Sequence, residues 1–426
     1  MSDGTATAHL LQPKLFAVLR EGYDADTLRR DAIAGITVAI VALPLSMAIA
    51  VASGVSPERG LFTAIVGGFL VSALSGSRFQ IGGPAGAFIT LVAAAVAQFG
   101  VGGLLTAVLM SGVMLVLLGL FRLGSLVRHI PHPVTVGFTA GIAVTIAASQ
   151  IKDLTGLTLA GHEPAEFFPK LVALAQSLPS FNAWAAGLGV GVAALIFWLR
   201  CTQPKWPGML IAVGGAAILA ALLHLPVETI ASRFGGIPHG LPSPALPALA
   251  PATIAAVLPT ALSFTLLGAV ESLLSAKVAD SMTGRQHRSN MELIGQGLAN
   301  VGASLFGGIC VTGTIARTAT NIRAGARTPV AGIIHAGALL LFMLIAAPLA
   351  GYIPLSALAG VLMVVCWTMA EKAEFAHLLR AWPTALVLLI TFGGTLAKDL
   401  TIGITLGCAA AALLYYFRQR VPEEGA

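Results

Sequence analysis

The chain has 426 residues, of which 57% are hydrophobic and 10% are charged, and its mean hydropathy is +0.89. A water-soluble domain of this length does not need so much apolar sequence to fill its core, so the composition excludes a soluble protein and indicates an integral membrane protein. The net charge of +6 comes from basic residues scattered over short loops, which is typical of membrane topology and argues against a nucleic acid partner.

Residues 1–31 are polar and lack the apolar core and cleavage site of a secretory signal, so we expect a cytoplasmic segment before a membrane domain of residues 32–426. Apolar runs then recur that can cross about 30 Å of hydrocarbon, whole or shortened by a break. The predicted spans are 32–53, 58–75, 84–98, 102–121, 132–151, 183–199 and 208–224, followed by 255–280, 290–306, 311–322, 328–346, 353–369, 382–397 and 401–417.

Basic residues fall mainly on one side of these spans. If the spans alternate from a cytoplasmic N-terminus, eighteen basic residues lie inside and five outside, with Arg317 left at membrane depth. This asymmetry predicts a multi-pass protein of the plasma (inner) membrane with both termini in the cytoplasm. Since each half has seven spans, an odd number, the second half is inverted relative to the first if the halves are repeats.

Two stretches interrupt the apolar pattern with glycine, proline and hydroxyl residues, in matching places of the two halves. They are Gln80–Phe88 (QIGGPAGAF) and Gly307–Asn321 (GGICVTGTIARTATN). Backbone that is not helical is tolerated at membrane depth only where it is buried in protein or lines a cavity. Paired breaks of this kind are the best sequence indication of a transporter's binding site.

Each break frees backbone N–H groups at the start of a short half-helix, and these groups carry partial positive charge. The predicted ligand is therefore an anion. In the first break, Ala85, Gly86 and Ala87 follow Pro84 as a rim of small residues, although close helix packing also favours small residues. In the second break we favour Gly313 and the amides after it, because threonine hydroxyls also bond to their own helix.

Glu271 lies in the middle of an apolar span, where an ionised side chain costs about 3 kcal/mol or more. We interpret it as a proton-coupling carboxylate that faces the substrate cavity together with Ser275, which lies one turn further on the same face. The alternative is a structural acid bonded to a neighbouring helix. Arg317 offers positive charge to an anion or to Glu271, or it snorkels to the membrane surface.

The sequence predicts no cofactor and no resident metal. The four cysteines stand singly, without a spacing that would suit metal ligands. No nucleophile, acid and base cluster together, so the sequence does not indicate an enzyme.

Five blocks in the same order resemble the sulfate permease (SulP) family of anion transporters, and the resemblance covers nearly the whole chain. The blocks are Ala34–Leu61, QIGGPAGAF at Gln80, IPHPVTVGFTAG at Ile130, ELIGQGLANVGASLFGG at Glu292, and Thr314–Ala331. The resemblance implies an all-α fold of fourteen spans in two inverted sets of seven, with short extended stretches before half-helices 3 and 10. It also implies a core domain of about 32–121 and 255–346 that moves as an elevator against a gate domain of about 132–224 and 353–417.

The resemblance also implies site residues. Those expected to bind substrate are Ala85, Gly86, Ala87 and Phe88 in span 3, with Thr314, Ile315, Ala316 and Arg317 in span 10. Glu271 and Ser275 match an acid and a hydroxyl that hold sodium in cyanobacterial bicarbonate members. If sodium binds here, we expect Thr314 as a further ligand. Those members carry aspartate at the position of Glu271, so the coupling ion stays open, and we favour the proton.

The sequence departs from the family pattern in two places. Pro44-Leu45 is closer to the bicarbonate and dicarboxylate branch than to the sulfate branch, and the STAS domain that ends most members is not in this sequence. We expect proton-coupled symport of a small anion, a carboxylate or bicarbonate, with sulfate as a further option, across the lipid bilayer. The alternatives are a sodium-coupled bicarbonate symporter, a nucleobase symporter, and an anion channel or voltage-responsive motor. A homodimer is expected from the resemblance only.

Overall fold

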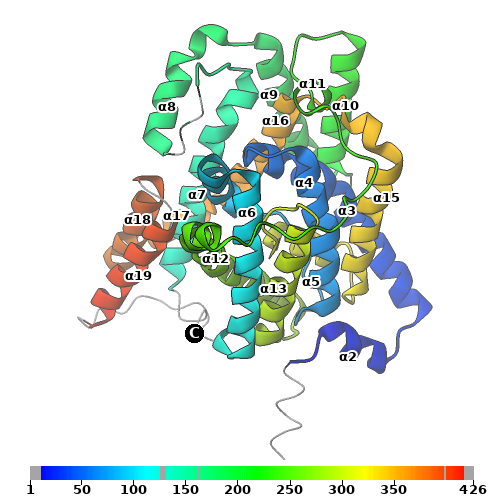
Figure 1. Ribbon diagram of the computed structural model, residues 1–426, viewed down its shortest axis with the longest axis vertical. Coiled ribbons are helices and arrows are strands. Elements are labelled where there is room, and N and C mark those ends of the chain that lie inside the picture. The colour runs from blue at the N-terminus through cyan, green and yellow to red at the C-terminus, as the bar shows by residue number, and fades with distance from the viewer. Residues whose placement is uncertain are drawn as a thin grey trace, which may run out of the picture. The chain divides into compact units, whose positions relative to one another are not determined.

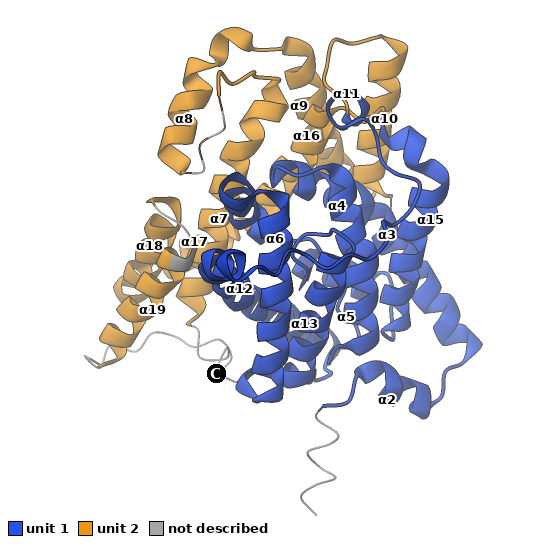
Figure 2. Cartoon of the chain, in the orientation of Figure 1, with its two compact units in different colours: residues 1–127, 230–351 blue, residues 128–229, 352–426 orange. Residues whose placement is uncertain are grey.

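The computed structural model describes residues 11–124, 131–161, 164, 166–204, 206–397 and 400–416. The described chain is almost entirely helical (Figure 1) and divides into two compact units, shown in blue and orange in Figure 2. Unit 1 comprises residues 1–127 and 230–351, and unit 2 comprises residues 128–229 and 352–426. Each unit is therefore built from two separate stretches of the chain.

Unit 1 contains the two interruptions and the helices around them. Its elements are α2 (Lys14–Glu21), α3 (Ala25–Ala52), α4 (Pro57–Phe62), a π-helical turn (Thr63–Gly67), α5 (Gly68–Leu74), β1 (Gly82–Gly83), a 3₁₀ turn (Gly86–Phe88), α6 (Ile89–Leu120), α11 (Ile230–Phe234), α12 (Pro251–Thr283), α13 (Ser289–Leu305), β2 (Thr312–Gly313), α14 (Ile315–Arg323) and α15 (Val330–Ala350).

Unit 2 is helical throughout its described residues. Its elements are α7 (His132–Thr155), α8 (Phe167–Gln176), a 3₁₀ turn (Leu178–Ser180), α9 (Ala183–Thr202), α10 (Gly208–Leu222), α16 (Leu355–Met369), α17 (Lys372–Leu378), α18 (Trp382–Ala397) and α19 (Leu400–Tyr416).

The helices follow the predicted spans with shifted ends. Helix α3 begins at Ala25, well before the predicted start at residue 32, and α12 covers 33 residues. Predicted spans 3 and 4 are continuous in α6 except at Gly100, whose φ of 67° and ψ of −178° suit only glycine. Seven helices of the described chain are long and apolar enough to cross a membrane alone, so the count of fourteen stays a prediction.

Three of the sequence predictions reach residues outside the described ones. These are residues 1–10 of the predicted N-terminal segment, Ile130 of a family block, and Phe417 at the end of the last predicted span.

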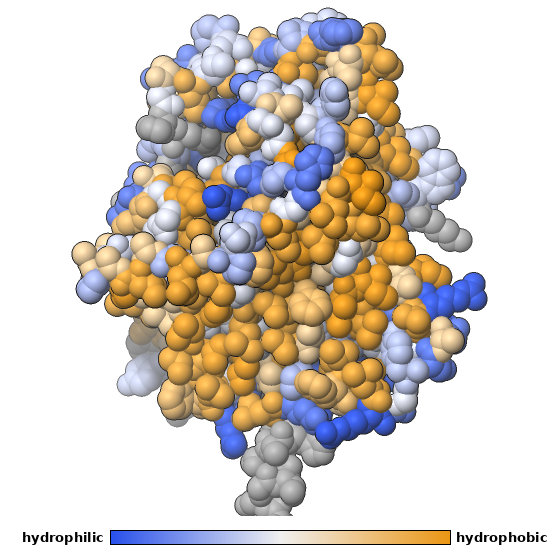
Figure 3. Space-filling model, turned by 45° about the vertical axis from the view of Figure 1, so that its right-hand side comes forward, coloured by the Kyte–Doolittle hydropathy of each residue, from blue (hydrophilic) through white to orange (hydrophobic). Residues whose placement is uncertain are grey.

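Large apolar side chains cover much of the surface of both units. Figure 3 shows them in orange over a broad part of the visible face. They include Leu266 and Ile345 in unit 1 and Ile218 and Leu413 in unit 2, all more than half exposed. Exposed apolar area of this extent is not stable in water. The exterior is that of a protein surrounded by lipid.

Small residues bring the helices of unit 1 into backbone contact. A Cβ atom built on Gly112 of α6 would lie 2.7 Å from the carbonyl oxygen of Gly297 on α13, and one built on Gly297 would lie 2.5 Å from that of Gly112. This approach is possible only without side chains on both helices, as is common where helices pack inside a membrane. The contact holds α13 against α6, the helix that continues the first half-helix.

Hydrogen bonds of the Asp31 side chain connect the start of α3 to the loop between α14 and α15. Its carboxylate is fully buried and accepts from the amides of Arg327 at 2.7 Å and Thr328 at 3.1 Å, and also from the Thr328 hydroxyl. The Tyr23 hydroxyl donates to it at 3.2 Å. Burial and the neighbouring Asp31 raise the pKa of Tyr23 to about 12, so this phenol stays protonated as a donor.

We expect Asp31→Ala to lower the free energy of unfolding by about 3 kcal/mol, because two backbone amides and two hydroxyls lose a charged acceptor. Thermal unfolding of the purified protein in detergent measures the loss. Asp24→Ala is the matched control, since Asp24 is exposed and accepts from the Thr27 amide as the α3 cap, at a cost of about 1 kcal/mol. Equal losses of stability in the two variants would contradict the role of Asp31 in connecting α3 to the loop between α14 and α15.

Candidate functional site

The two interruptions form one short antiparallel ribbon inside unit 1. Gly82 of β1 lies opposite Gly313 of β2, and Gly83 lies opposite Thr312. Beyond the ribbon, the amide of Thr314 donates to the carbonyl of Ile81 at 3.1 Å. Segments about 230 residues apart thus form hydrogen bonds with each other's backbone N–H and C=O groups. In the chain, a half-helix follows each strand.

Close packing explains the glycines of the ribbon. A Cβ atom on Gly83 would lie 1.8 Å from Nη1 of Arg317, and one on Gly313 would lie 1.6 Å from Nε2 of Gln80. Real Cβ atoms do not approach other heavy atoms so closely. The ribbon therefore has room for a hydrogen atom only at these positions.

Two polar side chains of α13 hold the residue before β2. Nε2 of Gln296 and Nδ2 of Asn300 both donate to the carbonyl of Val311, at 2.5 and 2.9 Å. The amide of Val311 donates in turn to Oδ1 of Asn300 at 2.9 Å. Gln296 and Asn300 lie one turn apart on the same helix face. Their amide groups replace the backbone partners that a continuous helix would have supplied.

Helix α12 holds the ribbon from another side through Ser272. Its hydroxyl accepts from the amide of Gly313 at 3.2 Å and bonds to the hydroxyl of Thr312 at 2.9 Å. The carbonyl of Ser272 accepts from Nε2 of Gln80 at 3.1 Å. One turn further along α12, the Ser275 hydroxyl donates to that of Thr318 at 3.3 Å. Helix α12 therefore contacts both interrupted segments.

The half-helices begin with open amide groups. The first starts with the 3₁₀ turn Gly86–Phe88 and runs into α6, and the second is α14; neither has a side-chain cap. The amides of Gly86 and Ala87, and those of Ile315, Ala316 and Arg317, find no acceptor among the residues that the structure describes. Unpaired amides at a helix start carry partial positive charge and bind anions.

These open amides differ in how accessible they are. Ile315 is 36% exposed, Ala316 is exposed and Gly86 is half-buried, whereas Ala85, Ala87, Phe88 and Thr314 are buried. The start of α14 is thus open to a ligand, and the residues around it form a closed wall.

Gly313 differs from its expected role. The sequence assigned the Gly313 amide to the anion, but in the structure that amide donates to the Ser272 hydroxyl, and the next amide, of Thr314, donates to Ile81. Both are used inside the ribbon because β1 and α12 lie directly beside it. The amides that remain open begin two residues later, at Ile315.

Arg317 is buried against the first half-helix. Its side chain is 1% exposed, and Nη2 donates to the Ser46 hydroxyl at 3.1 Å and to the Pro84 carbonyl at 3.3 Å. No carboxylate in the described chain forms an ion pair with it. Burial excludes a snorkelling role. The guanidinium instead places uncompensated positive charge next to the break at Pro84, which is costly unless an anion lies nearby.

Glu271 lies on the face of α12 that packs against both half-helices. Three residues before it, a Cβ on Gly268 would lie 3.7 Å from the ring of Phe88, and four residues after it Ser275 bonds to Thr318. These three α12 residues share one face. Oε2 of Glu271 is shielded from solvent and has no hydrogen-bond partner in the described residues. The structure thus offers no neighbouring helix that bonds to this oxygen.

Sequence reasoning missed the residues that hold the ribbon. These are Ser272, Gln296 and Asn300, and Ser46, which accepts from Arg317, was missed as well; all four are buried. Their only signal was a polar side chain within an apolar helix, and Gln296 and Asn300 added a spacing of four. That signal predicts that the side chain forms a buried hydrogen bond, but it does not predict which residue is the bonding partner.

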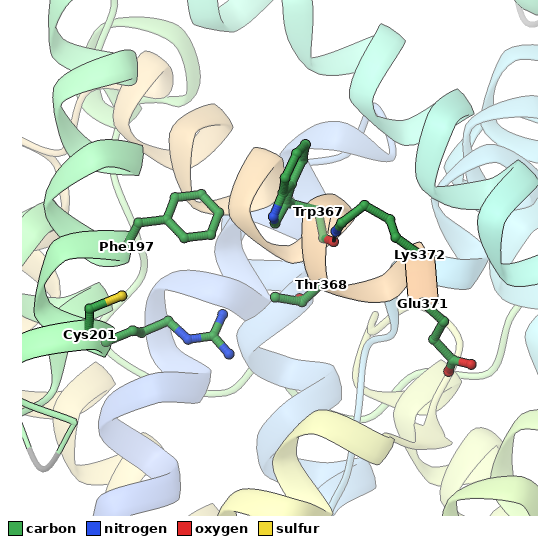
Figure 4. Close-up of a pocket in the computed structure, with 7 residues that line it drawn as sticks. Phe197, Cys201, Trp367, Thr368, Glu371 and Lys372 are labelled. Atoms are coloured by element: carbon green, nitrogen blue, oxygen red, sulfur yellow. Dashed lines mark hydrogen bonds between the residues drawn. The ribbon is translucent and has the colours of Figure 1, made fainter. Parts of the chain in front are cut away.

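Unit 2 has a cavity of about 470 Å³ between α9 and the end of α16 (Figure 4). Nζ of Lys372 donates to the Trp367 carbonyl at 2.6 Å and lies 4.0 Å from the centre of its indole ring. Its charge is thereby already engaged. Trp367 and Cys201 are exposed, so the cavity opens at the surface of unit 2. It lacks the open amides of the half-helices, and we do not assign it to substrate.

A sequence profile described as the sulfate permease family matches residues 28–391. The chain belongs to the sulfate permease family. It is therefore an anion transporter of the membrane and not an enzyme.

Curated relatives carry sulfate and bicarbonate transporter names. The chain is 44% identical over 406 residues to the putative sulfate transporter YvdB of Bacillus subtilis, which covers 95% of this chain and 76% of that protein. It is 32% identical over 362 residues to the bicarbonate transporter BicA of Picosynechococcus, which covers 82% of this chain and 63% of that protein. The chain thus spans less than two thirds of that BicA.

Solved structures agree in fold. The transmembrane domain of a cyanobacterial BicA superposes with a TM-score of 0.81 at 29% identity, over 90% of this chain and 98% of that one. SLC26A9 superposes with a TM-score of 0.89 at 18% identity, over 98% of this chain and 70% of that one, which shows the shared fold alone.

We expect Gly313→Ala to stop uptake of the transported anion and to destabilise the protein by about 1–3 kcal/mol, because the new methyl group displaces Gln80 from the ribbon. Gly337→Ala is the control, since a Cβ at that exposed helical position meets no atom within 4 Å. Uptake into proteoliposomes and thermal unfolding measure the two effects. Normal uptake by the Gly313 variant would contradict this prediction, because it would show that the ribbon still functions when Gln80 is displaced.

Proposed function

We propose that the starts of the two half-helices in unit 1 bind one small anion and carry it across the membrane. The observation that carries the proposal is the pair of open amide sets, at Gly86–Ala87 and at Ile315–Arg317, beside the uncompensated charge of Arg317. Partial positive charges and a buried guanidinium favour a negatively charged ligand. Ala85, Phe88 and Thr314 complete the proposed site as its wall.

The proposed substrate is a carboxylate or bicarbonate, with sulfate as the next candidate. Relatives named for both sulfate and bicarbonate support this class. The open donors are backbone amides, which recognise negative charge and hydrogen-bond geometry more than the shape of the rest of the ligand. A site of this kind suits anions with few atoms.

We propose that Glu271 couples transport to a proton. Its Oε2 atom is shielded and finds no hydrogen-bond donor among the described residues, and a shielded carboxylate oxygen without a donor is costly while the group is charged. A proton neutralises the group without further ligands. Sodium is the competing ion, with Ser275 and Thr314 as its other proposed ligands.

For the mechanism we propose an elevator movement in which unit 1 is the core that carries the anion and unit 2 is the gate. All proposed ligand groups belong to unit 1, which supports transport of the site as one body. We further propose a multi-pass protein of the plasma membrane, with both termini cytoplasmic from the distribution of basic residues, and a homodimer from family resemblance.

A panel of uptake assays in proteoliposomes tests this function. The substrates are labelled bicarbonate, succinate, fumarate, sulfate and uracil, each with a pH gradient, a sodium gradient or neither. We expect one of the small anions to accumulate when the outside is acid, and uracil neither to accumulate nor to compete. Accumulation driven by a sodium gradient at constant pH would show that the coupling ion is sodium and not the proton. Currents far above carrier turnover would indicate a channel instead.

We expect Glu271→Gln to retain part of substrate binding and to lose acid-stimulated uptake completely, because glutamine cannot release a proton. Glu166→Gln is the control, since Glu166 is an exposed acid of unit 2. Binding is followed by isothermal titration and uptake over external pH 5 to 8. Acid stimulation that survives in the Glu271 variant would exclude this residue as the coupling group.

A further inference from the structure

Unit 1 has a cavity of about 370 Å³ with polar side chains in its lining. Its lining includes three arginines and three threonines: Arg78, Arg285, Arg327, Thr27, Thr283 and Thr328. They come from the loop before β1, the end of α12, the loop after α14 and the start of α3. Helix α2 closes one side through Val18 and Glu21.

The cavity has more positive than negative charge. Among the described residues of its lining, Glu21 is the one acid, and it forms an ion pair with Arg78. Nη1 of Arg327 lies 3.4 Å from Asp26, on the neighbouring turn of α3. Arg285 is exposed and makes no hydrogen bond or ion pair with a described residue. One guanidinium therefore remains available to a ligand.

Further cations crowd this end of the unit. The pKa of Lys14 is lowered from its ordinary value, first by burial and then by the charges of Arg288 and Arg78. The pKa of Arg288 is likewise lowered, first by burial and then by Arg78. Cations that disfavour each other's charge are close together, and a bound anion stabilises all of them. Charge repulsion and an open cavity thus occur at the same place.

The donors match a phosphate group. Guanidinium groups present paired N–H donors that fit phosphate oxygens, and hydroxyls satisfy the remaining ones. Helix α2 adds apolar surface beside the cavity, since Phe16 is 49% and Leu19 is 51% exposed while Val18 is buried toward the unit. A short helix with one exposed apolar side and a basic surround is typical of a segment that lies at the membrane surface.

We propose that this cavity binds the phosphate of an acidic phospholipid, with the acyl chains lying along the exposed side chains of α2. The site is separate from the anion site of the proposed function, because none of its lining residues supplies an open half-helix amide. It lies on the same two chain segments, however. Arg78 and Phe79 lead directly into the β1 ribbon, and the Phe79 carbonyl accepts from Asn321 of α14 at 2.9 Å. Lipid binding therefore stabilises the segments that carry the half-helices.

Thermal unfolding of the full chain in lipid nanodiscs tests the proposal. Discs of phosphatidylcholine are compared with discs that contain phosphatidylglycerol. A ligand that binds only the folded state raises the unfolding midpoint, so we expect the acidic lipid to raise that of the wild type. Arg285→Gln is expected to remove at least half of this rise while leaving the midpoint in phosphatidylcholine unchanged.

Arg20→Gln is the matched control, because Arg20 is a basic residue of α2 that does not line the cavity. We expect it to keep the full rise. An equal rise in the wild type and the Arg285 variant would overturn the site, and equal losses in both variants would show unspecific attraction of basic residues to lipid.

Millimolar inorganic phosphate or glycerol 1-phosphate, added to phosphatidylcholine discs, separates the two sources of a phosphate group. We expect no rise with either. A rise that depends on Arg285 would assign the cavity to a soluble phosphate compound and overturn the lipid assignment. None of these readouts uses anion uptake, so their failure leaves the proposed transport function untouched.

Discussion

The structure of unit 1 depends on one constraint, that polypeptide without helical hydrogen bonds must find other partners when no water is near. Residues 79–84 and 309–314 meet this constraint by pairing with each other and with polar side chains from α12 and α13. Ser272, Gln296 and Asn300 supply these bonds. The same arrangement excludes larger residues at Gly83 and Gly313, because the ribbon packs directly on Arg317 and Gln80. The fold thus permits an interruption in both halves only because the interruptions are adjacent.

That pairing also decides which amides remain for a ligand. Strand bonds and Ser272 use the donors up to Thr314, so the free donors start where α14 begins. The buried guanidinium of Arg317 adds charge beside the other half-helix through Ser46 and Pro84. On the side of α12 that packs against the half-helices, Oε2 of Glu271 has no hydrogen-bond partner among the described residues. An unpaired guanidinium and an unbonded carboxylate oxygen are costly to bury, and this cost favours the proposed binding of an anion together with a coupling cation.

The sequence was enough to locate the interruptions, because glycine, proline and threonine stand out against apolar neighbours at Pro84 and Gly313. It also indicated the mid-span acid and the helical character of nearly every segment. It did not reveal that the Gly313 amide is used internally or that Arg317 turns toward Ser46. These facts depend on side chains up to about 270 residues away in the chain. Sequence periodicity predicts which face of a helix is buried, but it does not predict which residue packs against that face. Helix ends were also missed, as at Ala25 of α3, since polar residues extend a helix beyond the hydrocarbon.

The interrupted segments expose different donor groups at the ribbon and where they leave it, and the difference has a physical reason. Where the segments form the ribbon, there is no room for side chains at Gly83 and Gly313, so the donors of the proposed anion site are backbone amides with fixed positions. Where the same segments leave the ribbon, at Arg78 and at Arg327, arginine side chains line a cavity instead, with that of Arg327 about half exposed and that of Arg78 mostly buried. Guanidinium groups there can select a phosphate by its geometry. The proposed transport site thus holds its anion through backbone amides, whereas the proposed lipid site holds a phosphate through guanidinium groups with paired donors.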